Sequence, residues 1–180
     1  MTGPTLVLDV ETQRLAHEVG GWEHVDRLGL AAAVVLDVDS GVFHRFTEGE
    51  SSHLVAQLQA AAHIIGYNLL RFDYAVLRPY GFEPGALQPT RTTDLLEHLA
   101  RALGFRVALD NVAGATLGVQ KSADGLAAVA WYRQGEIAKV LDYCEEDVRI
   151  TARLWEPGRA KHQVAFRDRD FRLRTVPVSW

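Results

Sequence analysis

The chain has 180 residues, of which 48% are hydrophobic and 23% charged, so it fits one globular domain with a substantial core. Its formal net charge of −4 argues against a protein that coats nucleic acid through positive charge alone. A single cysteine excludes an internal disulfide framework, and neither a signal peptide nor an apolar run long enough for a bilayer is visible, so we expect a cytoplasmic protein without a membrane span.

The first third of the chain predicts an antiparallel meander followed by a helix. Apolar, β-branched runs predict three strands, and polar residues around glycines predict the connections between them. The expected strands are residues 5–10, 28–37 and 42–46, with a long loop over 12–27 and a turn at 39–41. Ser51 or Ser52 is expected to cap a helix that extends to about residue 61.

Strands and helices are expected to alternate from residue 63 onward. The expected strands are residues 63–67 and 90–93, and the expected helices lie between Asn68 and Pro79, then at 94–103, 109–117, 124–131 and 136–155. Asn68 and Asp94 are expected to cap the helices that follow them, with Ser122 or Asp124 capping the later one. Pro157 and the glycine after it are expected to end the last helix.

Three antiparallel strands followed by strand–helix alternation predict an α/β fold with a mixed sheet flanked by helices. We expect residues 1–156 to form this domain and 157–180 to form a basic hairpin packed on it. Residues 157–180 carry six lysines and arginines against two aspartates, a net of +4, which leaves −8 for the remainder. This basic segment could follow a nucleic-acid backbone, or its charges could protect a hairpin edge.

The first chemical motif is the acidic end of the first strand, where Asp9 and Glu11 precede Thr12. Residues two apart on a strand point to the same face, so both carboxylates are expected to project together. Two close carboxylates repel each other unless a cation or protons lie between them. Hard oxygen ligands of this kind suit Mg²⁺ or Mn²⁺.

Two further motifs place acids beside apolar elements. Asp73 follows a buried strand and is expected to face the strand ends from the start of a helix. Tyr143 and Asp147 are four residues apart, so they share one face of the last helix at the margin of its apolar stripe. The histidines show no spacing typical of a zinc site.

Together these motifs resemble the DEDD superfamily of proofreading and RNase D-like exonucleases. D-x-E-T at residues 9–12 resembles its first motif, N-x-x-x-F-D at 68–73 its second, and Y-x-x-x-D at 143–147 its third, in the tyrosine subclass. More closely, the chain resembles the YprB-like bacterial RNase H-like family, in the polar stretch at 20–22 and in residues 121–126. The resemblance covers residues 5 to about 156 and implies an RNase H-like fold.

The resemblance also implies a two-metal 3′→5′ exonuclease that releases nucleoside 5′-monophosphates from DNA or RNA. Asp9, Glu11 and Asp147 would hold one Mg²⁺ or Mn²⁺, Asp9 would bridge to a second ion near Asp73, and Tyr143 would orient the attacking water. The chain contains no helicase or polymerase domain, so we expect a stand-alone enzyme or a subunit that a helicase or polymerase recruits.

Several polar residues near the motifs are candidates for binding single-stranded or 3′-ended nucleic acid: Thr12, Asn68, Arg71, Lys121 and Ser122. A first alternative is a catalytically silent module that holds nucleic acid or a partner, although such a module has no use for four repelling acids. A second alternative is a phosphohydrolase with Asp9 as nucleophile. That chemistry uses D-x-D-x-T, whereas this chain has Glu11 and Thr12.

Overall fold

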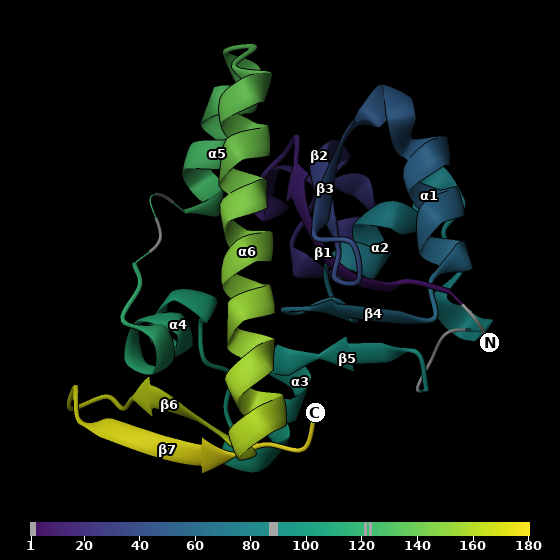
Figure 1. The fold of residues 1–180 in the computed structure, drawn as a ribbon. Helices are drawn as coiled ribbons and strands as arrows, with labels where there is room; N and C mark the ends of the chain where they lie inside the picture. Colours follow the sequence, from purple (N-terminus) through teal and green to yellow (C-terminus); the bar gives the residue numbers. More distant parts are fainter. Residues whose placement is uncertain (1–2, 87–89, 121, 123) are drawn as a thin grey trace.

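The computed structural model describes residues 3–86, 90–120, 122 and 124–180, and it shows a five-stranded sheet flanked by helices (Figure 1). The strand order is β3-β2-β1-β4-β5. The strands are β1 (Thr5–Thr12), β2 (Leu30–Asp37), β3 (Val42–Thr47), β4 (His63–Gly66) and β5 (Thr92–Asp94). The first three pair antiparallel, whereas β4 and β5 join in parallel, which confirms the predicted mixed α/β sheet.

The second half of the central strand β1 is paired on one side only. β4 pairs with β1 over Thr5, Leu6 and Val7, whereas β2 pairs along almost the whole strand. The pairing with β2 is irregular between Glu11 and Thr12. The carboxyl end of β1 therefore extends past β4 and leaves room for side chains from other elements.

Helices cover both faces of the sheet, and each face has its own apolar core. They are α1 (Ser51–Ala60) and α2 (Asp73–Leu77) on one face, and α3 (Leu95–Leu103), α4 (Leu109–Leu117) and α6 (Ile137–Lys161) on the other. Leu6, Leu8 and Val10 of β1 pack toward α1 and α2, whereas Val7 packs toward α3, α4 and α6. The odd-numbered residues of β1 therefore face α6.

The helix α5 (Gly125–Arg133) packs beside α6 through small side chains. Ala31 and Ala32 of β2 contact Ala128, Val140 and Tyr143 in a separate buried cluster. Because alanines project little from the sheet, α5 and α6 approach the strands closely there. This close approach places the middle of α6 over the carboxyl end of β1 (Figure 1).

The helix α6 extends to Lys161, so the prediction that Pro157 and Gly158 end it is wrong. Proline in a helix interior removes one backbone hydrogen bond and costs about 3 kcal/mol, but neighbouring packing can outweigh this. Here Gly158 is buried against the indole of Trp180, whose N–H donates to the carbonyl of Trp155 at 3.1 Å. The helix instead ends where His162 adopts a left-handed conformation with φ of 54°.

Two predicted helix caps are also wrong. Ser51 is the first residue of α1 and does not cap it, because a short 3₁₀ turn, η3 (Glu48–Glu50), leads directly into the helix. Asn68 does not cap α2, which begins only at Asp73. Asn68 instead takes a left-handed conformation, with φ of 78°, inside the turn that follows β4.

The stretch 12–27, predicted as a loop, contains two 3₁₀ helices. They are η1 (Ala16–Glu18) and η2 (Trp22–Arg27). Two further 3₁₀ turns, η4 (Arg78–Tyr80) and η5 (Pro84–Ala86), follow α2. Val25 of η2 joins the core on the α2 side, so this stretch is anchored to the domain.

The chain ends in the predicted hairpin, with strands β6 (Gln163–Arg167) and β7 (Leu173–Pro177). The hairpin lies beside α4 and the carboxyl end of α6, away from β3 (Figure 1). Thr116 of α4 exchanges hydrogen bonds of 2.9 and 3.0 Å with the backbone of Ala165. Among the described residues, no helix combines the length and apolar character needed to cross a membrane.

Candidate active site and metal centre

Three acidic side chains meet where α6 crosses the carboxyl end of β1. Asp9 and Glu11 lie on the α6 face of β1, and Asp147 faces them from the helix. One carboxylate oxygen of each residue lies within 4.8 Å of the others. Glu11 and Asp147 are 8% and 5% exposed, so this negative charge is concentrated in a largely buried position.

Asp73 approaches the same strand from the other side of the sheet. Its Oδ1 accepts a hydrogen bond of 3.0 Å from the backbone N–H of Val10, which lies between Asp9 and Glu11. The side chain is 2% exposed. Burial, followed by the charge of Asp9, raises the pKa of Asp73 well above its usual value. Asp73 is therefore close enough to Asp9 for their charges to interact, although it is not among the three acids grouped within 4.8 Å.

Tyr143 lies one helical turn before Asp147 and is also directed at the site. Its hydroxyl forms a hydrogen bond with Asp147, and its ring packs edge-on against Trp131 with centroids 6.2 Å apart. Burial raises the pKa of the phenol, and the charges of Asp147, Glu11 and Asp9 raise it further. The hydroxyl therefore stays protonated and remains able to donate a hydrogen bond.

The thiol of Cys144 contacts Asp9 from α6. It is fully buried and lies 3.2 Å from the backbone oxygen of Asp9 and 3.4 Å from its Oδ2. Burial raises the pKa of this thiol, and the charge of Asp9 adds to the effect. A protonated, inaccessible thiol fits a packing role, because thiol reactivity requires an exposed thiolate.

The turn that carries Asp73 is organised by Asp94, whose wider role the sequence did not reveal. As predicted, Asp94 caps α3, accepting from the N–H groups of Leu96 and Glu97 at 3.1 and 3.3 Å. The same carboxylate also accepts from Asn68 and Leu70 at 2.8 and 3.0 Å. The only sequence signal for this role was the position of Asp94 at the end of a strand beside β4.

A hollow of about 400 Å³ opens beside Glu11 and Thr12. Its walls include Trp22 and Phe72, whose ring centroids are 6.4 Å apart, and Leu126 of α5. A mostly apolar cavity with a polar end is typical of small-ligand sites. No local pattern predicts that the stretch 12–27 lines this cavity, because the contact between Trp22 and Phe72 joins residues far apart in the chain.

The structure distributes the predicted substrate-binding residues over several places. Thr12 lines the hollow, and its hydroxyl donates to the carbonyl of Arg14 at 3.0 Å. The side-chain oxygen of Asn68 accepts from Arg106, and Arg71 is exposed in the turn before α2. Ser122 hydrogen-bonds Glu146 of α6, whereas Lys121 lies outside the described residues.

The ligand set fits a hard divalent cation. The three clustered residues offer only carboxylate oxygens, which Mg²⁺ and Mn²⁺ prefer over the nitrogen and sulfur ligands typical of zinc. Their burial makes mutual repulsion costly, and a cation between them would relieve it. The residues present therefore suit a Mg²⁺ or Mn²⁺ centre at the carboxyl end of β1.

The comparison with protein families agrees with this geometry. A family model of the RNase H superfamily matches residues 6–157, a range that includes Asp9, Glu11, Asp73 and Asp147 and that stops before the β6–β7 hairpin. No curated protein sequence matches the chain. With the match extending from β1 into α6 and the mixed sheet in place, the chain belongs to the RNase H superfamily.

Proposed function

We propose that the chain is a 3′→5′ exonuclease of the DEDD superfamily, in its tyrosine subclass, that uses two Mg²⁺ or Mn²⁺ ions to hydrolyse the terminal phosphodiester of DNA or RNA. One observation carries the proposal: carboxylate oxygens of Asp9, Glu11 and Asp147 converge within 4.8 Å. RNase H-like nucleases use divalent metals, which fits this cluster. The resemblance to the YprB-like family belongs to the same proposal.

The division of labour that we propose is the one that the family resemblance implies, and the positions of the side chains support it. Asp9, Glu11 and Asp147 would hold one ion, and Asp73 would help Asp9 to hold a second. When bound, the ions would lower the pKa of a water molecule and offset charge on the departing oxygen. The protonated hydroxyl of Tyr143 would orient that water. The water would release a proton to solvent as its oxygen attacks phosphorus, the bond from phosphorus to the 3′ oxygen would break, and the departing 3′ oxygen would take up a proton from solvent.

The hollow beside Glu11 gives a place for the terminal nucleoside. Trp22, Phe72 and Leu126 supply flat or apolar surface for a base, and Thr12 lies at the acidic end. Base–aromatic stacking contributes about 1–3 kcal/mol per base and tolerates any sequence. The hollow therefore supports an enzyme that removes terminal nucleotides without reading their identity.

The test is cleavage of a labelled single-stranded oligonucleotide with Mn²⁺ or Mg²⁺. A 5′ label should give a ladder of shortening products, whereas a 3′ label should appear at once as mononucleotide. Asp147→Ala should lower the rate by at least about 100-fold, because it removes a proposed metal ligand. Asp142→Ala is the matched control, since Asp142 lies on the same helix but is exposed and paired with Arg45.

The outcomes separate the exonuclease from its alternative. Metal-dependent shortening that Asp147→Ala abolishes and Asp142→Ala leaves within about twofold would support the proposal. Binding of the oligonucleotide without cleavage under either metal would instead identify a silent nucleic-acid-binding module. Cleavage that is equally sensitive to both substitutions would contradict the assignment of Asp147 to the metal site.

A further inference from the structure

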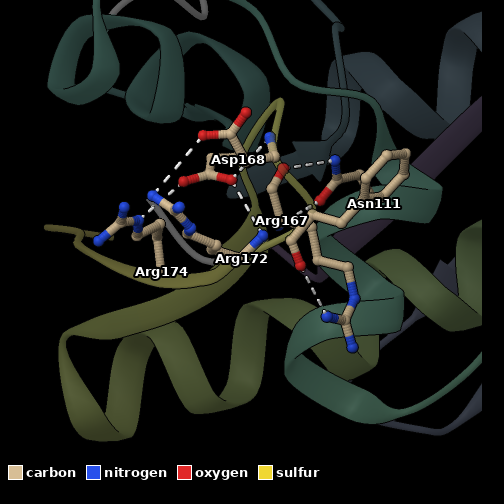
Figure 2. Close-up of polar contacts among 7 residues, drawn as sticks. Asn111, Arg167, Asp168, Arg172 and Arg174 are labelled. Atoms are coloured by element: carbon tan, nitrogen blue, oxygen red, sulfur yellow. Dashed lines mark hydrogen bonds and ion pairs between the residues drawn. The ribbon is translucent and has the colours of Figure 1, made fainter.

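The turn between β6 and β7 forms a second polar centre, apart from the carboxylates and outside the residues that match the family model. Residues 168–172 connect the strands, and Asn111 of α4 fixes their start. The side-chain amide of Asn111 donates to the carbonyl of Arg167 at 3.0 Å, and its oxygen accepts from the N–H of Arg167 at 2.7 Å (Figure 2). The turn is therefore held in one orientation beside α4.

The two acids of this turn are already engaged within the hairpin. Asp168 accepts from the guanidinium of Arg174 at 2.9 Å and from the backbone N–H groups of Asp170 and Arg172 at 3.0 Å (Figure 2). Asp170 lies 3.7 Å from the guanidinium of Arg172. Asp168 is therefore paired with Arg174 and Asp170 with Arg172, so the charges of these two acids are offset within the hairpin.

Three other arginines surround the turn without a carboxylate partner in the described part of the chain. Arg106, Arg167 and Arg169 line an open hollow of about 580 Å³, together with the two paired acids Asp168 and Asp170. The guanidinium of Arg106 donates to the amide oxygen of Asn68, and that of Arg167 to the carbonyl of Phe171, so both contact neutral groups. Arg169 is exposed. Because Arg172 and Arg174 pair with the two acids, the three remaining arginines leave this region with a net positive charge, although the chain as a whole is acidic.

Two aromatic side chains line hollows that these arginines also line. Phe105 lines the same hollow and is 49% exposed, with its ring 6.0 Å from that of Phe166. Phe171, which is 80% exposed, lines a second hollow of about 560 Å³ that shares Arg167 and Asp168 with the first. Exposed rings among arginines are the combination that binds single-stranded nucleic acid, because bases stack on rings while guanidinium groups contact phosphates.

The arginine hollow is linked directly to the turn that carries Asp73. Arg106 bonds Asn68, and the hydroxyl of Tyr67 donates to the carbonyl of Val107 at 2.6 Å. Asn68 in turn donates its N–H to Asp94, which organises the residues leading to Asp73. The segment 105–108 therefore connects the two centres along the carboxyl edge of β4 and β5.

We propose that the strand being degraded runs from the carboxylate site across Arg106 into the hollow beside the β6–β7 turn, where Arg167 and Arg169 bind its phosphates and Phe105 and Phe171 stack its bases. The occupant is single-stranded nucleic acid 5′ to the cleaved end, and its identity rests on the proposed exonuclease function. Charge complementarity selects it, since arginines without acidic partners face a polymer with one negative charge per nucleotide. The hairpin would thereby hold long substrates in place.

The test measures binding of fluorescent oligodeoxythymidylate and oligouridylate to the full chain in a chelator, so that the strands stay intact. Arg106→Ala/Arg169→Ala is compared with Arg78→Ala/Arg153→Ala, which removes two exposed arginines elsewhere. Each phosphate contact to a single strand contributes a slope of about −0.7 in log affinity against log salt. Loss of two contacts should make the slope shallower by about 1.4 and weaken binding about 25-fold at roughly 0.1 M salt.

Strand length is the second variable. Strands of about 15 nucleotides should show the loss. Strands of about three nucleotides, too short to span the carboxylate site and the hairpin together, are compared with Mn²⁺ in place of the chelator, and the unmodified chain and both double variants should cleave them with equal KM. Phe105→Ala should weaken long-strand binding by about fivefold or more, the loss of one stacked base. Leu173→Ala, which removes an exposed but non-aromatic side chain, should not.

Three results would overturn the proposal: equal salt slopes for the two double variants, equal losses on short and long strands, or no binding of long strands by the unmodified chain. The first would favour an acidic protein surface as the partner of the hairpin. Hydrolysis is measured separately with Mn²⁺. If the chain cleaves but the two double variants have equal salt slopes, only the proposed strand path is ruled out. If the salt slopes differ as expected but no cleavage occurs, only the proposed exonuclease function is ruled out.

Discussion

The substitution Asp94→Asn tests whether one buried carboxylate holds the turn that carries Asp73. In the structure, Oδ1 of Asp94 accepts three backbone N–H groups and Oδ2 accepts a fourth, that of Leu70. Asparagine keeps an oxygen in only one of these positions. If the oxygen takes the place of Oδ1, the amide NH₂ faces the N–H of Leu70, and two donors meet where a charged acceptor stood.

The expected cost follows from that count. A hydrogen bond to a charged group contributes about 1.5–3 kcal/mol, and Asp94→Asn removes one of them, so the free energy of unfolding should fall by about 2 kcal/mol. With a urea dependence of about 2 kcal/mol per molar, the unfolding midpoint should shift down by about 1 M. Displacement of the turn should also slow Mn²⁺-dependent hydrolysis, measured without urea and at a temperature where the variant is folded.

Asp124→Asn is the matched control for this measurement. Among the described residues, Asp124 caps α5 by accepting from Ala127 alone, at 3.0 Å, and asparagine caps helices about as well as aspartate. The free energy of unfolding of Asp124→Asn should therefore differ from that of the unmodified chain by only about a few tenths of a kcal/mol. If both variants unfold within about 0.5 kcal/mol of each other, the bonds from Asp94 to the turn contribute nothing beyond an ordinary cap, and the reasoning fails.

Two other predictions concern the site, and a third concerns the strand β4 beside it. Saturating Mn²⁺ should raise the melting temperature by about 5–10 °C, and Asp9→Asn should remove at least half of that shift in calorimetry; an undiminished shift would place the ion elsewhere. Tyr143→Phe should lower turnover about 100-fold while leaving the Mn²⁺-induced shift intact, and a lost shift would mean that Tyr143 supports metal binding. Gly66→Ala should cost about 1–3 kcal/mol in urea unfolding, because a Cβ there lies 2.8 Å from the carbonyl of Leu8, whereas Gly49→Ala, with open space, should cost less than about 0.5 kcal/mol.

The parts of the fold that sequence predicted were those fixed by local chemistry. The helix α3 begins at Asp94 and is followed by Gly104, with φ of 79°, as the capping residues indicated. α4 likewise ends before Gly118. The order of three antiparallel strands before two parallel ones also followed from local signals, because a short turn after Asp37 permits only a hairpin whereas a helix must precede β4.

The errors arose where contacts distant in sequence outweighed local preference. Pro157 carries a strong helix-ending signal, but Trp180 packs on Gly158 and the helix continues. Asparagine is a common helix cap. In the structure, however, the N–H of Asn68 donates to Asp94 and its side-chain oxygen accepts from Arg106, so Asn68 stabilises a left-handed turn instead. These contacts with Trp180, Asp94 and Arg106 could not be inferred from the residues next to Pro157 or Asn68.

The candidate site divides in the same way. The periodicity of a strand put Asp9 and Glu11 on one face, and the periodicity of a helix put Tyr143 and Asp147 on one face, so their convergence needed only that α6 cross β1. The bond from Asp73 to the backbone of Val10 depends on a turn of irregular geometry. The arginine hollow joins residues from 105–111 and 167–170, a pairing that no local pattern specifies.

The separation of charge within the chain links the two proposals physically. Residues 1–156 carry −8 and residues 157–180 carry +4. A phosphodiester that approaches Asp9, Glu11 and Asp147 is repelled unless cations lie between them, so binding at this end should depend on metal. Under the two proposals, arginines at the hairpin would attract the same strand without metal, and salt would screen that attraction. A strand would then be held at its 5′ portion, and its 3′ end would enter the site only when the cations are bound.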